Sequence, residues 1–590
     1  MTGSNSSQAE VIAVYPDRVK ISVESIEDFS GDSPLKVGSY LRITDNEQCV
    51  LIAVIQNFSI EINDKAERRH LIEALPLGII QDGKFIRGGD ALTIPPTGVA
   101  PASEDDIKKI FEESVSEECK FVFASLVSDP GIDVPVDGNK FFNKHIAVVG
   151  STGAGKSHAI SKLIQESVSS KAGEFSLNNS HIVVFDIHSE YKTAFPKSNF
   201  LDVGDLNLPY WLLNSEELEE ILLDSGERDN YNQSAVFREL VTENKKKHNG
   251  DKGSVFYDSP LKFDIQEVLN ALYNIRNETI NVKGDSSYMI NDGSYDYTSG
   301  ASTDVSHGIT LSKEERLVKY FESRLDFFPT KNQNISKGGY ADGSLNKFFS
   351  RFESKVAEER LSFLFGEASQ EATLESTLEM LLGYSGEKSN VTVIDLSGVP
   401  FEVLSITVSL ISRILFEHGY FYKILRSDKG ETINNDAPIL LIYEEAHKYV
   451  PKSELTRFRA SKLSIERIAK EGRKYGVTLL LSSQRPSEIS ETIFSQCSNF
   501  IAMRLTNPND QNYVARLLPD TLGNISDKLP NLVAGEALLI GESVVMPSLV
   551  SIFRCEPEPS SNDIPYFELW KEEWKDLDFE AIKKKWINEE

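Results

Sequence analysis

The chain has 590 residues, of which 40% are hydrophobic and 26% are charged, a balance typical of globular proteins. This length exceeds what one hydrophobic core can hold, so we expect two to four domains. The formal net charge of −28 disfavours nucleic-acid binding but does not decide it, because an acidic exterior with a locally basic channel and a protein that never contacts DNA are both compatible with it.

The four cysteines are dispersed and form no C-x-x-C pair, so neither a disulfide framework nor a zinc site is expected. Residues 1–8 are small and polar and lack the features of a signal peptide. The apolar runs at residues 439–443 and 477–481 have strand length and are too short to span a bilayer. We therefore expect a cytoplasmic protein without a membrane anchor.

Residues 1–105 are typical of short strands separated by turns. Alternating or β-branched apolar residues predict strands at residues 11–14, 18–23, 40–43, 49–56 and 58–62. Glycine- and asparagine-containing pairs supply turns between them, and prolines near residue 100 mark a boundary. This pattern predicts a small N-terminal β-barrel.

Residues 106–214 and 389–558 have the pattern of an α/β domain with a parallel sheet, split in two. The expected strands are 145–149, 182–187, 391–396, 439–443 and 477–482, with a helix at 156–168. Between the two parts, residues 215–388 are rich in helical spacing and predict a helical insertion. Within the insertion, residues 283–307 are expected to form a mobile surface loop, and Lys245, Lys246 and Lys247 a solvated surface.

Residues 559–590 form a C-terminal helical tail in which three tryptophans lie among alternating charges. The spacing of Trp570 and Trp574 predicts that both rings lie on one helix face, and Trp586 follows. Two interpretations remain open: the tail docks onto the core of its own chain, or it braces a neighbouring subunit.

The loop between the first strand of the α/β domain and its helix matches the full pattern G-x-x-x-x-G-K-[ST]. Its residues are Gly150, Ser151, Thr152, Gly153, Ala154, Gly155, Lys156 and Ser157. Glycines let the backbone N–H groups turn toward phosphate, and the following helix adds its positive N-terminal end. Lys156 is expected to reach the β- and γ-phosphates and Ser157 to bind Mg²⁺, so the sequence predicts an ATP site.

Two further strand ends carry candidate catalytic residues. Glu444 and Glu445 end the strand 439–443; Glu444 is expected in the Mg²⁺ shell, and Glu445 is expected to polarise the attacking water. Gln484 follows the strand 477–482 and could sense the γ-phosphate. The alternatives are that the acids cap a helix and that the amide only satisfies loop backbone groups.

Taken together, these motifs resemble the HerA ATPases of the HerA/FtsK superfamily, which are hexameric, RecA-like DNA motors. The resemblance is carried by residues 145–157, 186–191, 444–447, 471–476, 483–486 and 535–538. It implies a RecA-like core, an N-terminal barrel similar to the HAS barrel, and a helical insertion. The segment 186–191 departs from the family at Ser189, where the family usually has glycine.

The resemblance also implies that ATP lies between subunits and that a neighbour contributes a basic group to it. Arg473 is the first candidate and Lys144 the second, at a position where the family often has arginine. A surface salt bridge is the alternative for each. Glu190 is expected to orient water or to couple to the neighbour, with a structural role as the alternative.

Lys452, Arg457, Arg459 and Lys462 lie close together in an otherwise acidic chain, in a region that faces the central channel of related motors. They are the candidates for contact with DNA phosphates, and a solvated helix face is the alternative.

The resemblance thus implies a hexameric, Mg²⁺-dependent ATPase that translocates or unwinds double-stranded DNA. It further implies an effector partner: a NurA-like nuclease in end processing, or in bacteria a sirtuin-like NADase or another nuclease in antiphage defence. The alternative is a ring scaffold that assembles an effector and uses ATP only as a switch. A membrane-anchored DNA pump is the least favoured interpretation.

Overall fold

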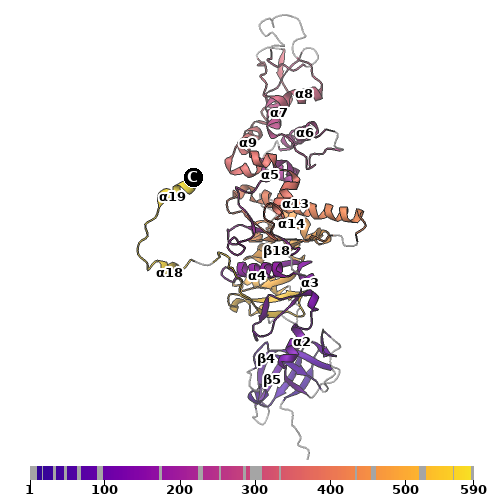
Figure 1. Cartoon of the computed structure of the whole chain (residues 1–590), viewed down its shortest axis with the longest axis vertical. Helices are drawn as coiled ribbons and strands as arrows, with labels where there is room; N and C mark the ends of the chain where they lie inside the picture. The colour runs from indigo at the N-terminus through magenta and orange to yellow at the C-terminus, as the bar shows by residue number, and fades with distance from the viewer. Residues whose placement is uncertain are drawn as a thin grey trace, which may run out of the picture.

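The computed structural model describes residues 9–15, 18–30, 35–44, 49–62, 68–88, 98–171, 176–222, 230–250, 254–282, 287–292, 309–330, 334–431, 435–453, 460–516, 526–561 and 564–586. The N-terminal sheet, the central domain and the helical insertion follow one another along the long axis of the molecule, and the C-terminal segment stands away from them (Figure 1). Within the described ranges, no helix has the length and apolar character needed to cross a membrane.

The N-terminal domain is a seven-stranded antiparallel sheet in the order β1-β2-β5-β4-β3-β7, with β6 beside β5. Its strands are β1 (Ala9–Val14), β2 (Val19–Val23), β3 (Tyr40–Ile43), β4 (Cys49–Ile62), β5 (Arg68–Gln81), β6 (Lys84–Arg87) and β7 (Val99–Pro101). The end strands β1 and β7 contact each other, so the sheet curls around an apolar core of its own. The predicted barrel is therefore present as a curled half-barrel.

The strands predicted at residues 49–56 and 58–62 are wrong as separate elements, because both belong to β4. Strand β4 pairs with β5 along its whole length, with irregularities between Ile52 and Ala53 and between Ile55 and Asn57. A bulge keeps a strand continuous while it interrupts the alternation of apolar side chains, which made one strand resemble two. Strand β5 was not predicted, because Pro76 and Gly78 interrupt its pattern.

The central domain contains a ten-stranded sheet in the order β13-β16-β12-β17-β18-β11-β19-β20-β21-β9. The strands from β13 to β19 in this order are parallel, and the last three are antiparallel. Their bounds are β9 (Ala124–Leu126), β11 (His145–Val149), β12 (His181–Asp186), β13 (Asn199–Leu201), β16 (Val391–Asp395), β17 (Ile439–Tyr443), β18 (Val477–Ser483), β19 (Cys497–Ala502), β20 (Glu536–Gly541) and β21 (Ser548–Ile552). The five predicted core strands are confirmed, whereas β13 and the strands from β19 to β9 were not predicted.

Successive residues of the central strands point to opposite faces of the sheet. Ala147 and Val149 belong to one buried cluster, and Ile146 and Val148 belong to another. Helices α13 (Phe401–Asp428) and α14 (Ala460–Glu471) cover the first face, and α4 (Lys156–Ser169) covers the second. A parallel sheet with helices on both faces and a phosphate loop after β11 confirms the predicted RecA-like P-loop ATPase core.

The insertion is mainly helical, as predicted. Its helices are α5 (Ser215–Leu222), α6 (Asn230–Asn249), α7 (Ile265–Asn277), α8 (Lys313–Glu322), α9 (Asn346–Val356), α10 (Ser362–Phe365), α11 (Glu367–Glu371) and α12 (Leu374–Leu381), with one small sheet of β14 (Thr279–Asn281) and β15 (Ile335–Lys337). Most of the predicted loop 283–307 lies outside the described residues. Its part 287–292 is not a surface loop, because Met289 packs against Phe328 and Ile335 and is fully buried.

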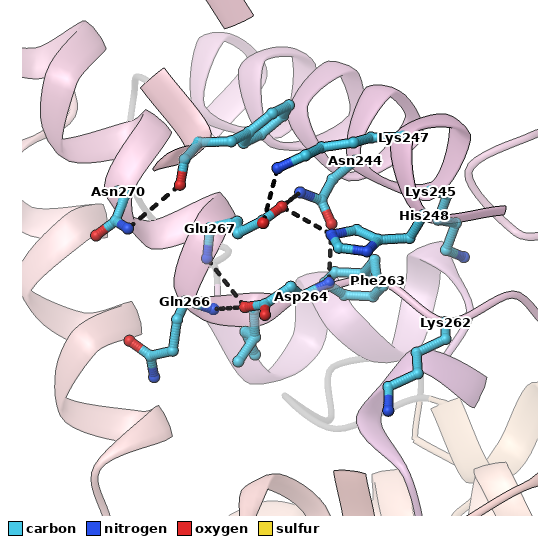
Figure 2. A network of polar contacts seen from close by, with 12 residues as sticks. Asn244, Lys245, Lys247, His248, Lys262, Phe263, Asp264, Gln266, Glu267 and Asn270 are labelled. Carbon is cyan, nitrogen blue, oxygen red and sulfur yellow. Dashed lines mark hydrogen bonds and ion pairs between the residues drawn. The ribbon is translucent and has the colours of Figure 1, made fainter. Parts of the chain in front are cut away.

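Helices α6 and α7 are joined by polar contacts around Glu267 (Figure 2). Its Oε1 accepts a hydrogen bond from Nζ of Lys247 at 2.7 Å, and its Oε2 accepts one from Nδ2 of Asn244 at 2.6 Å. Nε2 of His248 lies 2.8 Å from the same Oε2. Because one carboxylate on α7 receives three groups from α6, the two helices are held in a fixed register.

Lys245 is buried, so the expectation that residues 245–247 are all solvated is wrong for this lysine; Lys246 and Lys247 are exposed. Its Nζ donates to the carbonyl oxygens of Tyr257 and Ser259, both at 2.6 Å. No carboxylate among the described residues forms an ion pair with it. Burial lowers the pKa of Lys245 to about 8.

Lys245 therefore predicts a pH dependence of stability. Its folded-state pKa lies below the ordinary value of 10.5, so between about pH 8 and that value the unfolded chain binds a proton that the folded chain lacks. Stability contributed at this site should rise with pH across that window, by at most about 3 kcal/mol. We expect Lys245→Met to remove the rise and Lys246→Met to leave it, measured by urea unfolding at several pH values. Parallel pH profiles for wild type and Lys245→Met would contradict this assignment.

The C-terminal segment contains α18 (Tyr566–Leu569) and α19 (Phe579–Trp586), and its aromatic side chains do not dock onto the core of the same chain. Trp570 is 75% exposed, Trp574 96% and Trp586 84%. The predicted common helix face is also wrong, because α18 ends at Leu569 and Trp574 lies beyond it. Of the two interpretations, docking within the same chain is therefore excluded.

Candidate active site

The phosphate loop connects β11 to α4 at the carboxyl edge of the central sheet. Gly153 and Gly155 have φ angles of +70° and +98°, in the region that favours glycine. A Cβ on Gly155 would also lie 3.2 Å from the backbone nitrogen of Gly535. Both the backbone conformation and this close approach therefore disfavour a larger residue at position 155. The loop ends at the N-terminus of α4, whose unpaired N–H groups suit an anion.

Lys156 lies among the predicted carboxylates. The side chain is nearly buried, and burial lowers its pKa, while Glu445, Glu444 and Glu190 oppose this shift in that order. The structure therefore brings together the loop, Glu190 and the two acids that follow β17.

Ser157 and Glu444 are the residues that would hold Mg²⁺. Oγ of Ser157 donates to Oε2 of Glu190 at 2.7 Å. Burial raises the pKa of Glu444 to about 9, and the neighbouring Asp186 and Glu190 add to the rise. Within the described chain, Oε2 of Glu444 has no hydrogen-bond partner, which leaves a buried oxygen available to a cation.

The donor set suits a metal ion that arrives with the nucleotide. In the described ranges, no three His, Cys, Asp or Glu side chains could hold a metal by themselves. Mg²⁺ commonly takes one or two protein oxygens and completes its shell with water and phosphate oxygens. The hydroxyl of Ser157 and the carboxylate of Glu444 fit that role. When bound, the ion would neutralise charge on the β- and γ-phosphates.

Gln484 links the phosphate loop to the candidate catalytic acid. Its Nε2 donates to Oε1 of Glu445 at 2.6 Å, and its Oε1 accepts from Oγ1 of Thr152 at 2.7 Å. Glu445 has φ +47° and ψ +49°, a conformation that non-glycine residues rarely adopt and that clusters at functional sites. Nδ1 of His447 lies 3.2 Å from Oε2 of Glu445. A change at the loop can therefore reach Glu445 through one side chain.

Several residues of the site were not among the predicted site residues. Asp186 and Asp395 are the last residues of the paired strands β12 and β16. The carboxylate of Asp186 accepts hydrogen bonds from the backbone N–H groups of His188 and Tyr191. Oγ of Ser189 donates to Asp395 at 2.7 Å. The signal was available, because carboxyl ends of adjacent parallel strands meet at one edge. Ser189 has φ +57°, which explains why glycine suits this position.

Arg473 and Lys144 lie at the opposite edge of the sheet, before β18 and β11. Strand β18 has seven residues, so about 20 Å separates its two ends. Arg473 is exposed and forms no ion pair with any described residue, whereas Lys144 forms an ion pair with Glu542 of the same chain. The structure of one chain therefore does not bring either residue to its own phosphate loop.

The candidate DNA contacts are only partly described. Nζ of Lys452 lies 2.6 Å from Oε1 of Glu491 in an exposed ion pair. Lys462, on α14, is 9% exposed. Arg457 and Arg459 lie outside the described residues.

The strand of the two acids, the strand of Gln484 and the strand of the phosphate loop are neighbours in the order β17-β18-β11. This arrangement of a phosphate loop, a glutamate pair and a sensor amide at one sheet edge defines a P-loop ATPase. The family model "Helicase HerA, central domain" matches residues 121–415, which is half of the chain. The chain therefore belongs to the HerA helicase family, and it is an ATP-hydrolysing motor enzyme, as the sequence predicts.

A probable helicase of Methanocaldococcus jannaschii is 24% identical over 94% of this chain and 93% of that protein. The DNA double-strand break repair helicase HerA of Pyrococcus furiosus is 25% identical over 77% of this chain and 72% of that protein. The DNA double-strand break repair helicase HerA of Sulfolobus acidocaldarius is 25% identical over 83% of this chain and 79% of that protein.

Two solved structures resemble the chain more distantly. VirB4 of Thermoanaerobacter pseudethanolicus has a TM-score of 0.44 and 12% identity over 77% of this chain and 98% of that chain. The bacterial conjugative coupling protein TrwB has a TM-score of 0.40 and 11% identity over 73% of this chain and 89% of that chain. The fold class follows from the strand order and the phosphate loop of the chain itself.

Proposed function

We propose that this chain is a Mg²⁺-dependent ATPase that assembles into a hexameric ring and translocates or unwinds double-stranded DNA. The observation that supports the ring is the position of Arg473. It is exposed, unpaired among the described residues and one strand length away from its own phosphate loop. In a head-to-tail ring, the amino ends of the strands in one subunit would face the carboxyl ends of the strands in the next subunit. Arg473 would then lie beside the ATP of that neighbour.

The groups of the site divide the work of hydrolysis between two subunits. Lys156 binds the β- and γ-phosphates, Glu445 accepts the proton of the attacking water, and Gln484 reports the γ-phosphate to Glu445. Arg473 of the neighbour balances charge on the transferred phosphoryl group. Lys144 is the second candidate for that role and would first have to leave Glu542.

Double-stranded DNA as the substrate is supported by the relatives, two of which are named DNA double-strand break repair helicases. Lys452, Arg457, Arg459 and Lys462 are the proposed phosphate contacts. Exchange of Glu491 for a phosphate costs Lys452 little, because exposed ion pairs contribute about 0–1 kcal/mol. Lys462 is the weakest candidate, because it is almost buried.

The N-terminal sheet is the proposed docking surface for an effector, either a NurA-like nuclease or a sirtuin-like NADase or other nuclease, in DNA-end processing or antiphage defence. The end of its strand β4 exposes Ile60 by 56% and Ile62 by 67%, two residues apart on one face of the strand. Clustered exposed apolar residues on a curled sheet are typical of a protein-binding surface.

Replacing Ile60 and Ile62 by Ser should release a co-purifying effector and leave ATP hydrolysis unchanged.

Hydrolysis measured with and without linear duplex DNA tests the proposed function. We expect DNA to raise the wild-type rate several-fold and to leave Lys156→Ala at background. A wild-type rate that ignores DNA, together with effector activity that needs ATP but no turnover, would instead support the ATP-switched scaffold.

The C-terminal tail is proposed as a brace between neighbouring subunits. Its base lies at the active site, because the backbone N–H of Ser560 donates to the carbonyl oxygen of Glu190 at 2.9 Å. From there residues 564–586 leave the body of their own subunit (Figure 1). Large aromatic side chains exposed to this degree gain most by burial against another surface.

We expect the double change Trp570→Ser and Trp574→Ser to shift the protein from hexamers to smaller species in light scattering. Phe256→Ser, which alters an aromatic side chain 66% exposed on the insertion, is the matched control and should leave the hexamer intact. Unchanged assembly of the double variant would exclude the brace.

A further inference from the structure

We propose that Arg504 is a second cation of the ATP site, which binds the β- and γ-phosphates of the nucleotide held by its own subunit. The proposal deepens the proposed function, because it rests on ATP binding at this loop. It is independent of the ring and of DNA. Arg504 follows the end of β19, the strand on the side of β11 opposite to the Gln484 strand.

The backbone fixes Arg504 beside the phosphate loop. The N–H of Met503 donates to the carbonyl oxygen of Val149 at 2.8 Å, and the N–H of Ser151 donates to the carbonyl oxygen of Arg504 at 2.8 Å. The N–H of Thr506 donates to Oγ of Ser151 at 3.1 Å. Residues 503–506 therefore form one wall of the loop, and their position cannot change without a change in the loop.

The side chain of Arg504 already reaches the loop. Its Nη2 donates to the carbonyl oxygen of Gly153 at 3.3 Å, which is longer than the usual 2.9 Å of such bonds. The side chain is half-buried and forms no ion pair with any residue that the structure describes. A guanidinium with one long bond to a neutral carbonyl has most of its five donors available. Phosphate oxygens would satisfy them better than Gly153 does.

The charges of the site explain why a second cation is needed. Glu445, Glu444 and Glu190 are the carboxyl groups that interact electrostatically with Lys156. The triphosphate of ATP would bring further negative charge into this acidic environment, against one lysine and a bound Mg²⁺. Arg504 forms no ion pair with a carboxylate among the described residues, and so it can offset this repulsion without first breaking one.

Gln484 and Arg504 would then contact the phosphate loop from opposite sides. Gln484 contacts it through Thr152, and Arg504 contacts it through Gly153, the next residue. When phosphates enter, Arg504 would exchange the Gly153 carbonyl for phosphate oxygens, and its charge would favour nucleotides that carry a β-phosphate over AMP.

The test compares dissociation constants of ATPγS, ADP and AMP for the full chain with Mg²⁺ present, measured by calorimetry. We expect Arg504→Gln to weaken ATPγS and ADP by about 10- to 100-fold and to leave AMP within about threefold, because charge-assisted bonds to the β- and γ-phosphates are lost. Arg504→Lys should recover part of this loss. Arg516→Gln, just after the C-terminal end of the following helix α16 (Pro508–Ala515), is the matched control and should bind like wild type.

The melting temperature of the nucleotide-free protein separates binding from a structural role. It should be the same for wild type and Arg504→Gln, because only the long bond to Gly153 is removed. Unchanged ADP affinity, or an equal loss for AMP and ADP with a lower melting temperature, would overturn the proposal. If the wild-type chain itself binds none of these nucleotides, the ATP site fails, and that outcome is distinct from the failure of Arg504.

Discussion

Glu445→Gln is expected to reduce the rate of ATP hydrolysis about 10³-fold while ATP binding is retained, because a general base contributes about 10²- to 10⁴-fold. The substitution keeps the shape of the side chain and removes its ability to accept a proton. Glu445 is 4% exposed, and its Oε1 accepts a hydrogen bond from Nε2 of Gln484. A glutamine of the same size keeps an oxygen that can accept this bond, so it can occupy the same place. Removal of one negative charge beside Lys156 should also favour phosphate binding.

Steady-state phosphate release and ATPγS binding measure the two halves of this prediction. Glu166→Gln is the matched control, because Glu166 lies on α4, pairs with Lys162 at the surface and belongs to no part of the site. Hydrolysis by Glu445→Gln within tenfold of wild type would show that another group accepts the proton.

Arg473→Ala is expected to reduce hydrolysis about 10³-fold, and the activity is expected to return when this variant is mixed with Lys156→Ala. Each variant alone lacks one half of every site. In a mixed ring an interface is competent when Arg473→Ala supplies the loop and Lys156→Ala supplies the arginine. Random mixing gives about one such interface in four, so an equal mixture should recover about a quarter of the wild-type rate.

The control for mixing is Arg467→Ala, because Arg467 packs over Phe416 within its own chain and lies outside both edges of the site. This variant should keep its activity in the absence of a partner. A mixture of Arg473→Ala and Lys156→Ala that stays at background, with rings formed and subunits exchanged, would place Arg473 in a structural role.

The central α/β core was predictable because its strands are buried on both faces and its loop is a fixed motif. Strand β11 and the loop were predicted at the residues where they occur, and Glu444, Glu445 and Gln484 meet because neighbouring parallel strands end together. The departures have local causes. A bulge in β4 interrupted its alternation, and burial of Lys245 depends on a turn at Tyr257 and Ser259 that its polar sequence surroundings conceal.

The remaining site residues could not be ranked from the sequence, because their roles depend on which strands are neighbours. Arg504 follows a strand that was not predicted, and only the pairing of β19 with β11 brings it to the loop. Arg473 precedes β18, and its distance from the loop is the length of that strand. The Ser157–Glu190 contact joins segments that are separated by a helix and a strand.

Displacement of a third strand from a DNA triplex most directly tests the claim that this ATPase moves along double-stranded DNA. The assay needs no effector and separates movement from binding. We expect wild type with ATP and Mg²⁺ to displace the strand, and we expect Glu445→Gln, which should still bind ATP, to leave it in place. Displacement by Glu445→Gln equal to that of wild type, or none by a wild-type protein that hydrolyses ATP on the same DNA, would contradict the motor function.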